Sequence, residues 1–298
     1  WQLNYETYIP NTNSWYKEIY SATTEQVALF GELKYRVTDK LSATIGARWF
    51  EYDRDRNERK EWPAGNPYDT DIYQGKDDDT LFKFALDYSL SDNKMLYFLY
   101  SEGYRLGGYN SIKNPSSVLP DTYDPDNLRN FEIGLKSQWL DNRLQFNLTL
   151  YQMDWEDIQR NITDPDDWTA NGHVNMGDAE IRGLETSLSY RITDNLRIDA
   201  SYSWNDSELQ DDYWLSELVD LNDTDNQDEQ LGARGQELAI APPQKLWNDL
   251  QYDMPNLFTG FDGWIRYDHS WRDAQYHDWW NAMNAQTGYG GRKLMEKV

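Results

Sequence analysis

The sequence predicts an all-β protein, more specifically an antiparallel β-barrel that spans a membrane. Apolar and polar side chains alternate in many short segments, which puts one row of side chains on each face of a strand. The connections between these segments alternate between short and long. The chain of 298 residues has no uninterrupted apolar run of the ~18 to 20 residues that a membrane helix needs. A barrel needs only every second residue apolar.

Composition narrows the function classes. The chain has 52 acidic and 28 basic residues and a net charge of −24, so nucleic acid is not an expected partner because a phosphate polymer requires a basic surface. The absence of cysteine excludes disulfides, thiolate metal sites and cysteine nucleophiles. Aromatic residues make up 15% of the chain, which argues against disorder.

The predicted strands follow one another along most of the chain. In the segment 41–49, Leu41, Ala43 and Ile45 alternate with Ser42 and Thr44, and the pattern continues to residue 49. The same alternation predicts strands over 27–37, 82–90, 131–139, 144–150, 184–192, 196–204, 246–254 and 261–271. Segment 95–100 is apolar on both faces, so its register stays open.

The connections are the most informative feature. Short polar turns begin at residues 38, 91, 140 and 193, about fifty residues apart, and 255–256 is a plausible fifth turn. Long polar loops are expected over 53–79, 107–127, 154–178 and 206–235. Consecutive hairpins therefore place every tight turn at one end and every long loop at the other, as in outer-membrane barrels. A soluble β-protein with aromatic residues in its core is the alternative reading.

Several segments resemble TonB-dependent outer-membrane receptors. The sequence Tyr-Ser-Glu-Gly-Tyr-Arg-Leu-Gly-Gly-Tyr-Asn at 100–110 is similar to the strand-to-loop signature of that family. Further matches are Ala-Leu-Phe-Gly-Glu-Leu at 28–33, Asn-Phe-Glu-Ile-Gly-Leu-Lys-Ser-Gln-Trp-Leu-Asp-Asn-Arg-Leu at 130–144, Tyr-Gln-Met-Asp-Trp-Glu-Asp-Ile at 151–158, Asn-Met-Gly-Asp-Ala-Glu-Ile-Arg-Gly-Leu-Glu at 175–185 and Gly-Gln-Glu-Leu-Ala-Ile-Ala-Pro at 235–242. Their order and spacing, from about residue 24 to 276, make the resemblance specific.

The resemblance implies a 22-stranded barrel whose lumen holds an N-terminal plug domain. Residues 1–298 then form a partial outer-membrane β-barrel domain of about twelve strands, the twelfth beginning at Arg292, with the plug domain and the terminal strands absent from this chain. The alternative is a complete twelve-stranded barrel, since bacterial barrels have even strand numbers from 8 upward. The implied location is the outer membrane of a Gram-negative bacterium.

The implied function is iron uptake: a receptor that imports a ferric siderophore by energised transport, with iron as cargo and no resident cofactor. The expected partners are outer-membrane lipid and lipopolysaccharide, small-molecule cargo, and the TonB energy-coupling complex acting through the plug. Catalytic motifs are missing from the sequence, so an enzyme is not expected. Alternatives are the same fold importing oligosaccharide, haem or cobalamin, a soluble acidic β-protein that binds or hydrolyses glycans, and a passive porin.

Ligand contacts are expected at the outer strand ends, where aromatic rings can stack on a planar chelate or sugar and arginine can bind anionic oxygens. The candidates are Tyr104, Arg105, Tyr109, Trp155, Trp168, Trp214, Trp271 and Trp279. Asp220, Asn222, Asp223, Asp225, Asp228 and Glu229 form an oxygen-rich segment that suits calcium but lacks EF-hand spacing. His173 and His277 lie in predicted outer loops, within reach of a haem or metal cargo.

Overall fold

The computed structural model describes residues 2–8, 17–61, 67–110, 119–163, 171–214, 230–239 and 241–275. Its main sheet has eleven strands, each antiparallel to its neighbours and in chain order: β1 (Gln2–Tyr8), β2 (Lys17–Arg36), β3 (Leu41–Glu61), β4 (Pro67–Ser91), β5 (Lys94–Arg105), β8 (Asp126–Trp139), β9 (Leu144–Glu156), β12 (Ala179–Arg191), β13 (Leu196–Leu209), β16 (Gln244–Phe258) and β17 (Phe261–Arg272). The all-β prediction is confirmed. Within the described ranges, no helix has the length and apolar character needed to cross a membrane.

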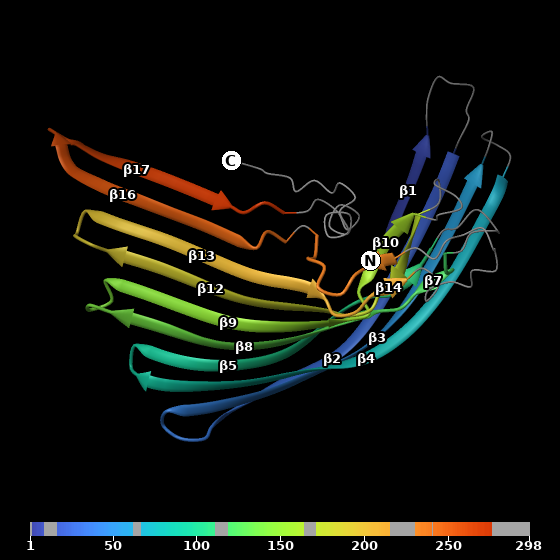
Figure 1. Cartoon of the computed structure of the whole chain (residues 1–298), viewed down its shortest axis with the longest axis horizontal. Coiled ribbons are helices and arrows are strands. Elements are labelled where there is room, and N and C mark those ends of the chain that lie inside the picture. Colours follow the sequence, from blue (N-terminus) through green and yellow to red (C-terminus); the bar gives the residue numbers. More distant parts are fainter. Residues whose placement is uncertain are drawn as a thin grey trace.

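The main sheet curves into a trough, with its tight turns at one end and its long connections at the other (Figure 1). Strands β1 and β17 are its two edges, and within the described ranges no pairing joins them. The described strands therefore do not close into the complete twelve-stranded barrel considered as the alternative. Arg292, the expected start of a twelfth strand, lies outside the described residues.

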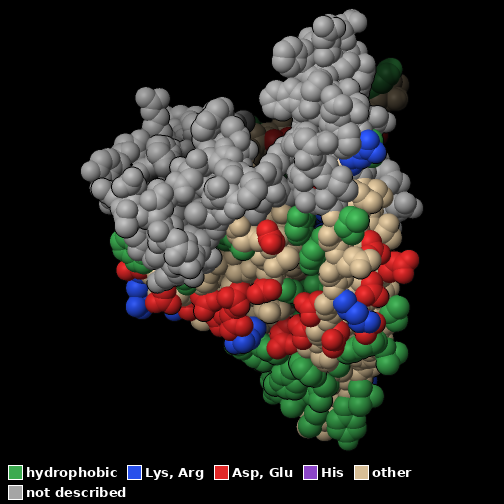
Figure 2. Space-filling model, turned by 90° about the vertical axis from the view of Figure 1, so that its right-hand side faces the viewer, with side chains coloured by type: hydrophobic (Ala, Val, Ile, Leu, Met, Phe, Trp, Pro, Cys, Tyr) green, Lys and Arg blue, Asp and Glu red, His purple; other side chains and the backbone are tan. Residues whose placement is uncertain are grey.

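Cross-strand register separates the two faces of the sheet. Leu33 pairs with Ile45, which pairs with Phe84, and this row of side chains lies on the outer face. The row beside it joins Glu32, Gly46 and Lys83 on the inner face. Outer-face side chains are strongly exposed, for example Leu29 at 74% and Ile265 at 63%. Figure 2 shows hydrophobic side chains gathered below a band of acidic and basic ones.

Threonine side chains stabilise two of the tight turns by hydrogen bonds to the backbone. The Thr38 hydroxyl accepts hydrogen bonds from the amides of Lys40 (3.2 Å) and Leu41 (3.0 Å). Thr193 does the same for the amides two and three residues ahead. The repeated Thr-Asp sequence thus closes two of the predicted turns through side-chain capping.

The fifth predicted turn, at 255–256, is wrong. Strand β16 continues to Phe258, and the turn lies at residues 259–260, where Gly260 has a φ of +82°. The register shifts between Met254 and Phe258, and Asn256 adopts a φ of +56°. Pro255 and Asn256 therefore mark an irregularity within the strand, because proline lacks the amide that a regular ladder requires.

The predicted loop over 53–79 is also wrong for most of its length. Strands β3 and β4 extend through it, and their polar side chains pair across the strands: Lys76 Nζ lies 2.7 Å from Glu51, and Gln74 donates to Asp55 at 2.9 Å. Both faces of these extensions are polar, so the apolar alternation that indicates a half-buried strand is missing. Strand β1 was not predicted either.

Segment 95–100 acquires its register from its neighbours. Leu96, Phe98 and Tyr100 belong to outer rows, whereas Tyr97 and Leu99 belong to inner rows. The Tyr97 hydroxyl lies 2.9 Å from the Thr149 hydroxyl on the inner face. The hydroxyl explains how an aromatic residue is accommodated among polar neighbours.

Candidate functional site

Three two-stranded hairpins form a layer at the end of the sheet with the long connections (Figure 1). They are β6 (Gly108–Tyr109) with β7 (Thr122–Tyr123), β10 (Gln159–Thr163) with β11 (Asn171–Asn175), and β14 (Tyr213–Trp214) with β15 (Gln230–Gly232). We call this the hairpin layer. A buried cluster at this end contains Leu119, Ile158, Ile162, Val174, Met176, Ala179, Leu209 and Leu238. The predicted loops 107–127, 154–178 and 206–235 thus contain strands and a small core.

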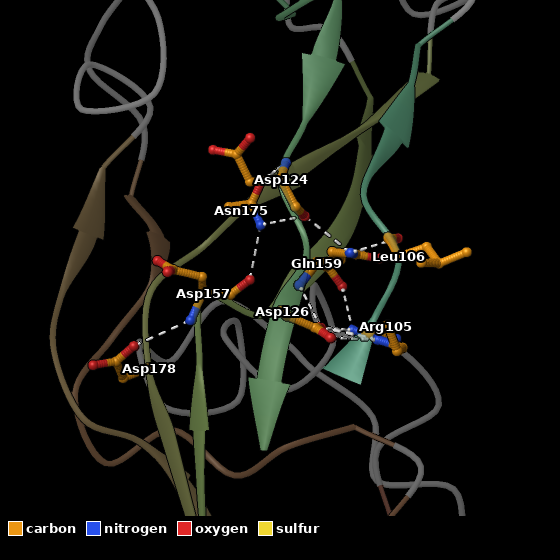
Figure 3. Close-up of polar contacts among 8 residues, drawn as sticks. All are labelled: Arg105, Leu106, Asp124, Asp126, Asp157, Gln159, Asn175 and Asp178. Carbon is orange, nitrogen blue, oxygen red and sulfur yellow. Dashed lines mark hydrogen bonds and ion pairs between the residues drawn. The ribbon is translucent and has the colours of Figure 1, made fainter. Parts of the chain in front are cut away.

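An arginine–aspartate pair fixes this layer to the end of β5. Arg105 forms an ion pair with Asp126, which is 1% exposed, and the Gln159 amide donates to the same carboxylate at 3.2 Å (Figure 3). The Gln159 side chain then donates to the carbonyls of Leu106 and Asp124, each at 3.0 Å. Burial of the carboxylate is therefore compensated by a cation and a backbone donor.

A second amide extends the network. Asn175 Nδ2 donates to the carbonyls of Asp124 at 3.0 Å and Asp157 at 2.9 Å, and the Asp157 amide donates to Asp178 at 3.2 Å (Figure 3). Asp157 has a φ of +55°. Burial and the nearby carboxylate of Asp178 raise the pKa of the Asp157 carboxyl. The network therefore brings like charges together, which favours the protonated form of Asp157.

Asn110 connects two of the hairpins. Its side-chain amide donates to the carbonyls of Pro120 (2.8 Å) and His173 (2.6 Å), and its side-chain oxygen accepts the His173 amide at 2.7 Å. The His173 ring lies against Tyr123, with 5.0 Å between ring centroids. Burial, together with the positive charge of Arg105, lowers the pKa of the His173 imidazole.

Aromatic and arginine side chains gather at the same end. The Tyr104 ring stacks on Phe50 at 4.0 Å, and its hydroxyl accepts a hydrogen bond of 2.6 Å from Gln26. The Tyr109 ring stacks on Tyr73 at 5.2 Å and lies 5.7 Å from the Arg56 guanidinium. The Arg105 guanidinium lies 4.9 Å from the Trp155 ring centroid.

The structure brings together four of the eight residues predicted to bind ligand, but it gives each of them a partner within the chain. Tyr104, Arg105, Tyr109 and Trp155 make the contacts just described. Trp214, 37% exposed, lies in β14. Register places Trp271 in an outer row with Leu246 and Tyr202. Trp168 and Trp279 lie outside the described residues.

The cation prediction falls on residues that the structure does not describe. The acidic segment from Asp220 to Glu229 and His277 both lie outside the described ranges. Within those ranges, no group of three or more His, Asp or Glu side chains is arranged to hold a metal ion. Calcium binding by that segment remains a prediction.

Sequence reasoning missed a groove on the inner face of the sheet. Its cavity of about 770 Å³ crosses β9, β12, β13, β16 and β17. Most lining residues come from two inner rows, one containing Glu185, Ser203, Lys245 and Arg272 and the other Ser187, Ser201, Trp247 and Ser270. We call this cavity the inner groove. The alternation of serine with apolar residues in 196–204 indicated small side chains on one face of a single strand. The pairing register of five strands was needed to show that such side chains lie next to one another.

A curved antiparallel sheet with an exposed apolar outer face, a polar inner face, tight turns at one end and an elaborate layer at the other is the wall of an outer-membrane β-barrel. The family model "TonB dependent receptor-like, beta-barrel" matches residues 1–294. The chain therefore belongs to the TonB-dependent receptor barrel family, whose members are outer-membrane proteins of Gram-negative bacteria. The recognition made from the sequence is confirmed.

Named relatives of this chain support the same family assignment. The chain is 24% identical over 194 residues, 64% of its length, to the "Probable TonB-dependent siderophore receptor PiuA" of Acinetobacter baumannii, and covers 25% of that protein. It is 26% identical over 194 residues, 63% of its length, to the pesticin receptor of Yersinia enterocolitica, and covers 28% of that protein. The chain thus spans about a quarter of the length of the curated relatives it matches.

A solved structure shares the fold. The ferric yersiniabactin uptake receptor FyuA of Yersinia pestis matches with a TM-score of 0.71 and 17% identity. The match covers 93% of this chain and 38% of that receptor. A soluble glycan-binding fold, considered from the sequence, is therefore excluded.

Proposed function

We propose that this chain forms part of the barrel wall of a receptor that imports a ferric siderophore by energised transport. The observation that carries the proposal is family membership together with relatives designated siderophore and pyoverdine receptors. In the proposed receptor a plug domain and further strands complete the barrel, and TonB acts on the plug. Cargo release then needs conformational work rather than covalent chemistry.

The hairpin layer supports this proposal as the outer platform that meets cargo. Two of its hairpins, β6 with β7 and β10 with β11, are joined through Asn110, Gln159 and Asn175, so they present a preorganised surface instead of independent loops. The aromatic rings of Tyr109 and Trp155 lie at this surface beside arginines that are ion-paired within the chain. Such rings suit the flat ring systems of iron chelates.

Binding to whole cells tests the proposed cargo. The full-length protein is produced in an iron-starved Gram-negative strain without its own siderophore receptors, and cells are offered radioactive iron as a tricatecholate, a trihydroxamate or a citrate complex. We expect saturable binding of at least one complex above vector-only cells, and growth on the same complex. If none binds and haem, cobalamin or an oligosaccharide does, the fold stands and the siderophore proposal falls.

A further inference from the structure

Strand β4 has an unpaired edge at the outer end of the sheet. Its pairing with β5 ends at Lys83 and Ser101, whereas its pairing with β3 continues to Pro67. Figure 1 shows β4 continuing past the end of β5. Within the described residues no strand pairs with this side of β4 beyond Lys83. We call the side of β4 that faces away from β3, over residues 72–82, the free edge.

Carboxylates occupy the part of the free edge nearest the membrane. In an antiparallel pair every second residue directs its amide and carbonyl away from the partner strand. The Phe82 amide points away from β3 and donates to the Glu102 side chain at 2.7 Å. The next two amides along the free edge donate to the side chains of Asp79 at 2.6 Å and Asp77 at 2.9 Å. Three successive edge amides are therefore bonded to carboxylates instead of to strand carbonyls.

The outer part of the free edge is open. Ile72, Gln74 and Lys76 follow the same alternation, so their amides and carbonyls point away from β3. Within the described residues these backbone groups have no hydrogen-bond partner, and the three side chains are exposed. Unpaired backbone groups on a strand edge are a template for pairing with another chain. An extended segment of another protein can therefore add here as a further strand.

The charge of the free edge determines which segment can add. Asp77, Asp78 and Asp79 place three consecutive carboxylates along it. Among the described residues none of the three forms an ion pair, and the neighbouring Lys76 is already paired with Glu51 at 2.7 Å. Opposite charges on neighbouring strands stabilise their pairing, and like charges oppose it. A second copy of this chain would bring the same aspartates and be repelled, whereas a basic segment would be attracted.

We propose that the free edge of β4 binds an extended segment of another protein that carries lysine or arginine, by strand addition at the outer surface. Backbone hydrogen bonds to residues 72–76 hold the segment. Its cations pair with Asp77 and Asp79 and draw these carboxylates away from the edge amides. The free edge begins where the apolar outer face ends, beside Trp49 and Phe82, so a partner reaches it from outside the cell. This interaction does not depend on the cargo of the receptor.

A synthetic peptide tests the strand addition. The probe has about ten residues in which lysine alternates with threonine, and its binding to the full-length receptor in detergent is followed by fluorescence anisotropy at physiological salt. The control peptide has the same sequence with methyl groups on its backbone amides, so it retains the charge but cannot pair as a strand. We expect the probe to bind at least tenfold more tightly than the control peptide.

Charge variants of the receptor locate the binding site. The double variant Asp77→Asn, Asp79→Asn removes two charges and leaves a side-chain oxygen for each edge amide. The matched control, Asp53→Asn with Asp55→Asn, makes the same change on β3, one strand away from the free edge. Heat-modifiable gel mobility verifies folding. We expect the first variant to bind the probe at least fivefold more weakly and the control variant to stay within about twofold of wild type.

A proline variant tests the backbone contact separately. The Gln74 amide faces away from β3, so Gln74→Pro removes an edge donor and leaves the β3 pairing intact. We expect this variant to bind the probe at least fivefold more weakly than wild type. If proline disturbs folding, the charge variants and the control peptide still decide the question.

Four outcomes would overturn the proposal. The first is no binding of the probe to the wild type, and the second is equal binding of the two peptides, which would show that charge alone holds the probe. The third is unchanged binding by the aspartate variant or by folded Gln74→Pro, which would place the probe elsewhere. The fourth is a wild-type dimer that Gln74→Pro abolishes, which would assign the free edge to a second copy. Iron uptake is measured separately, so failure here leaves the proposed function untouched.

Discussion

Arg105 illustrates how a residue typical of ligand binding can instead hold a fold together. Its guanidinium pairs with Asp126, a carboxylate that is almost fully buried. Removing one partner of such a pair costs more than the pair contributes, because the remaining charge stays buried and unpaired. The aromatic and arginine pattern therefore located the hairpin layer, but it could not distinguish internal contacts from ligand contacts.

Arg105→Gln should loosen the hairpin layer. We expect local opening to become easier by about 1 to 3 kcal/mol, because Asp126 loses a charged donor. Hydrogen exchange of the Ile158 and Gln159 amides measures the effect. Arg129→Gln is the control: its partner Glu156 is 35% exposed, far more than Asp126, so the loss should stay within about 0 to 1 kcal/mol. Equal effects in the two variants would contradict the structural role of Arg105.

His173 should make the hairpin layer sensitive to mild acid. Its pKa is lowered from the ordinary value of 6.5, so the unfolded layer binds the proton more readily. The contribution of His173 to the stability of the hairpin layer is complete above about pH 6.5. It is lost as the pH falls through the lowered pKa of the folded state. Asp157 acts in the opposite sense, since its raised pKa favours the folded layer when the carboxyl is protonated.

His173→Phe isolates this effect, because it retains a ring against Tyr123 and cannot titrate. Hydrogen exchange of the Met176 amide, corrected for intrinsic rates, should show a loss of protection from pH 7.5 to 5.5 in the wild type that is smaller in the variant. The same pH dependence in both proteins would show that His173 does not cause the acid sensitivity of the layer.

At the scale of elements, glycines in inner rows make room for tyrosine rings from the neighbouring strand. A Cβ at Gly183 would overlap the ring of Tyr151, and one at Gly134 would overlap the ring of Tyr97. Aromatic rings that cover glycines in this way help to fix strand register. Neither pairing is visible in the alternation of either strand alone.

Gly183→Ala should therefore destabilise the sheet by about 1 to 3 kcal/mol, because the Tyr151 ring must leave its position. Gly31→Ala is the matched control, since nothing lies within 4 Å of the added Cβ. The temperature at which the gel mobility of the folded barrel is lost should fall for the first variant and stay unchanged for the second. An equal fall in both would argue against ring packing as the cause.

Sequence reasoning was most successful for elements with one apolar and one polar face. Strands β9, β12 and β13 were predicted because lipid contact on one side demands alternation. The outer extensions of β3 and β4 were missed because both faces are polar there, and the hairpin layer was read as loops because its strands are only two to five residues long. Contacts such as Asn110 to His173 span 63 residues and leave no local pattern.

At the scale of the whole molecule, the two faces of one sheet have separate tasks. The outer face carries large exposed apolar side chains that suit lipid. The inner face carries the inner groove on β9 to β17 and ion pairs both on β2 to β4 and on β16 and β17, where Arg266 pairs with Asp249.

Energised uptake requires TonB, so transport is compared in cells with and without it. Radioactive iron complexed with the siderophore that the receptor binds is followed into matched cells with and without TonB, each producing the full-length protein. We expect equal surface binding in the two strains and accumulation only where TonB is present. Equal accumulation without TonB would identify a passive pore and contradict energised uptake.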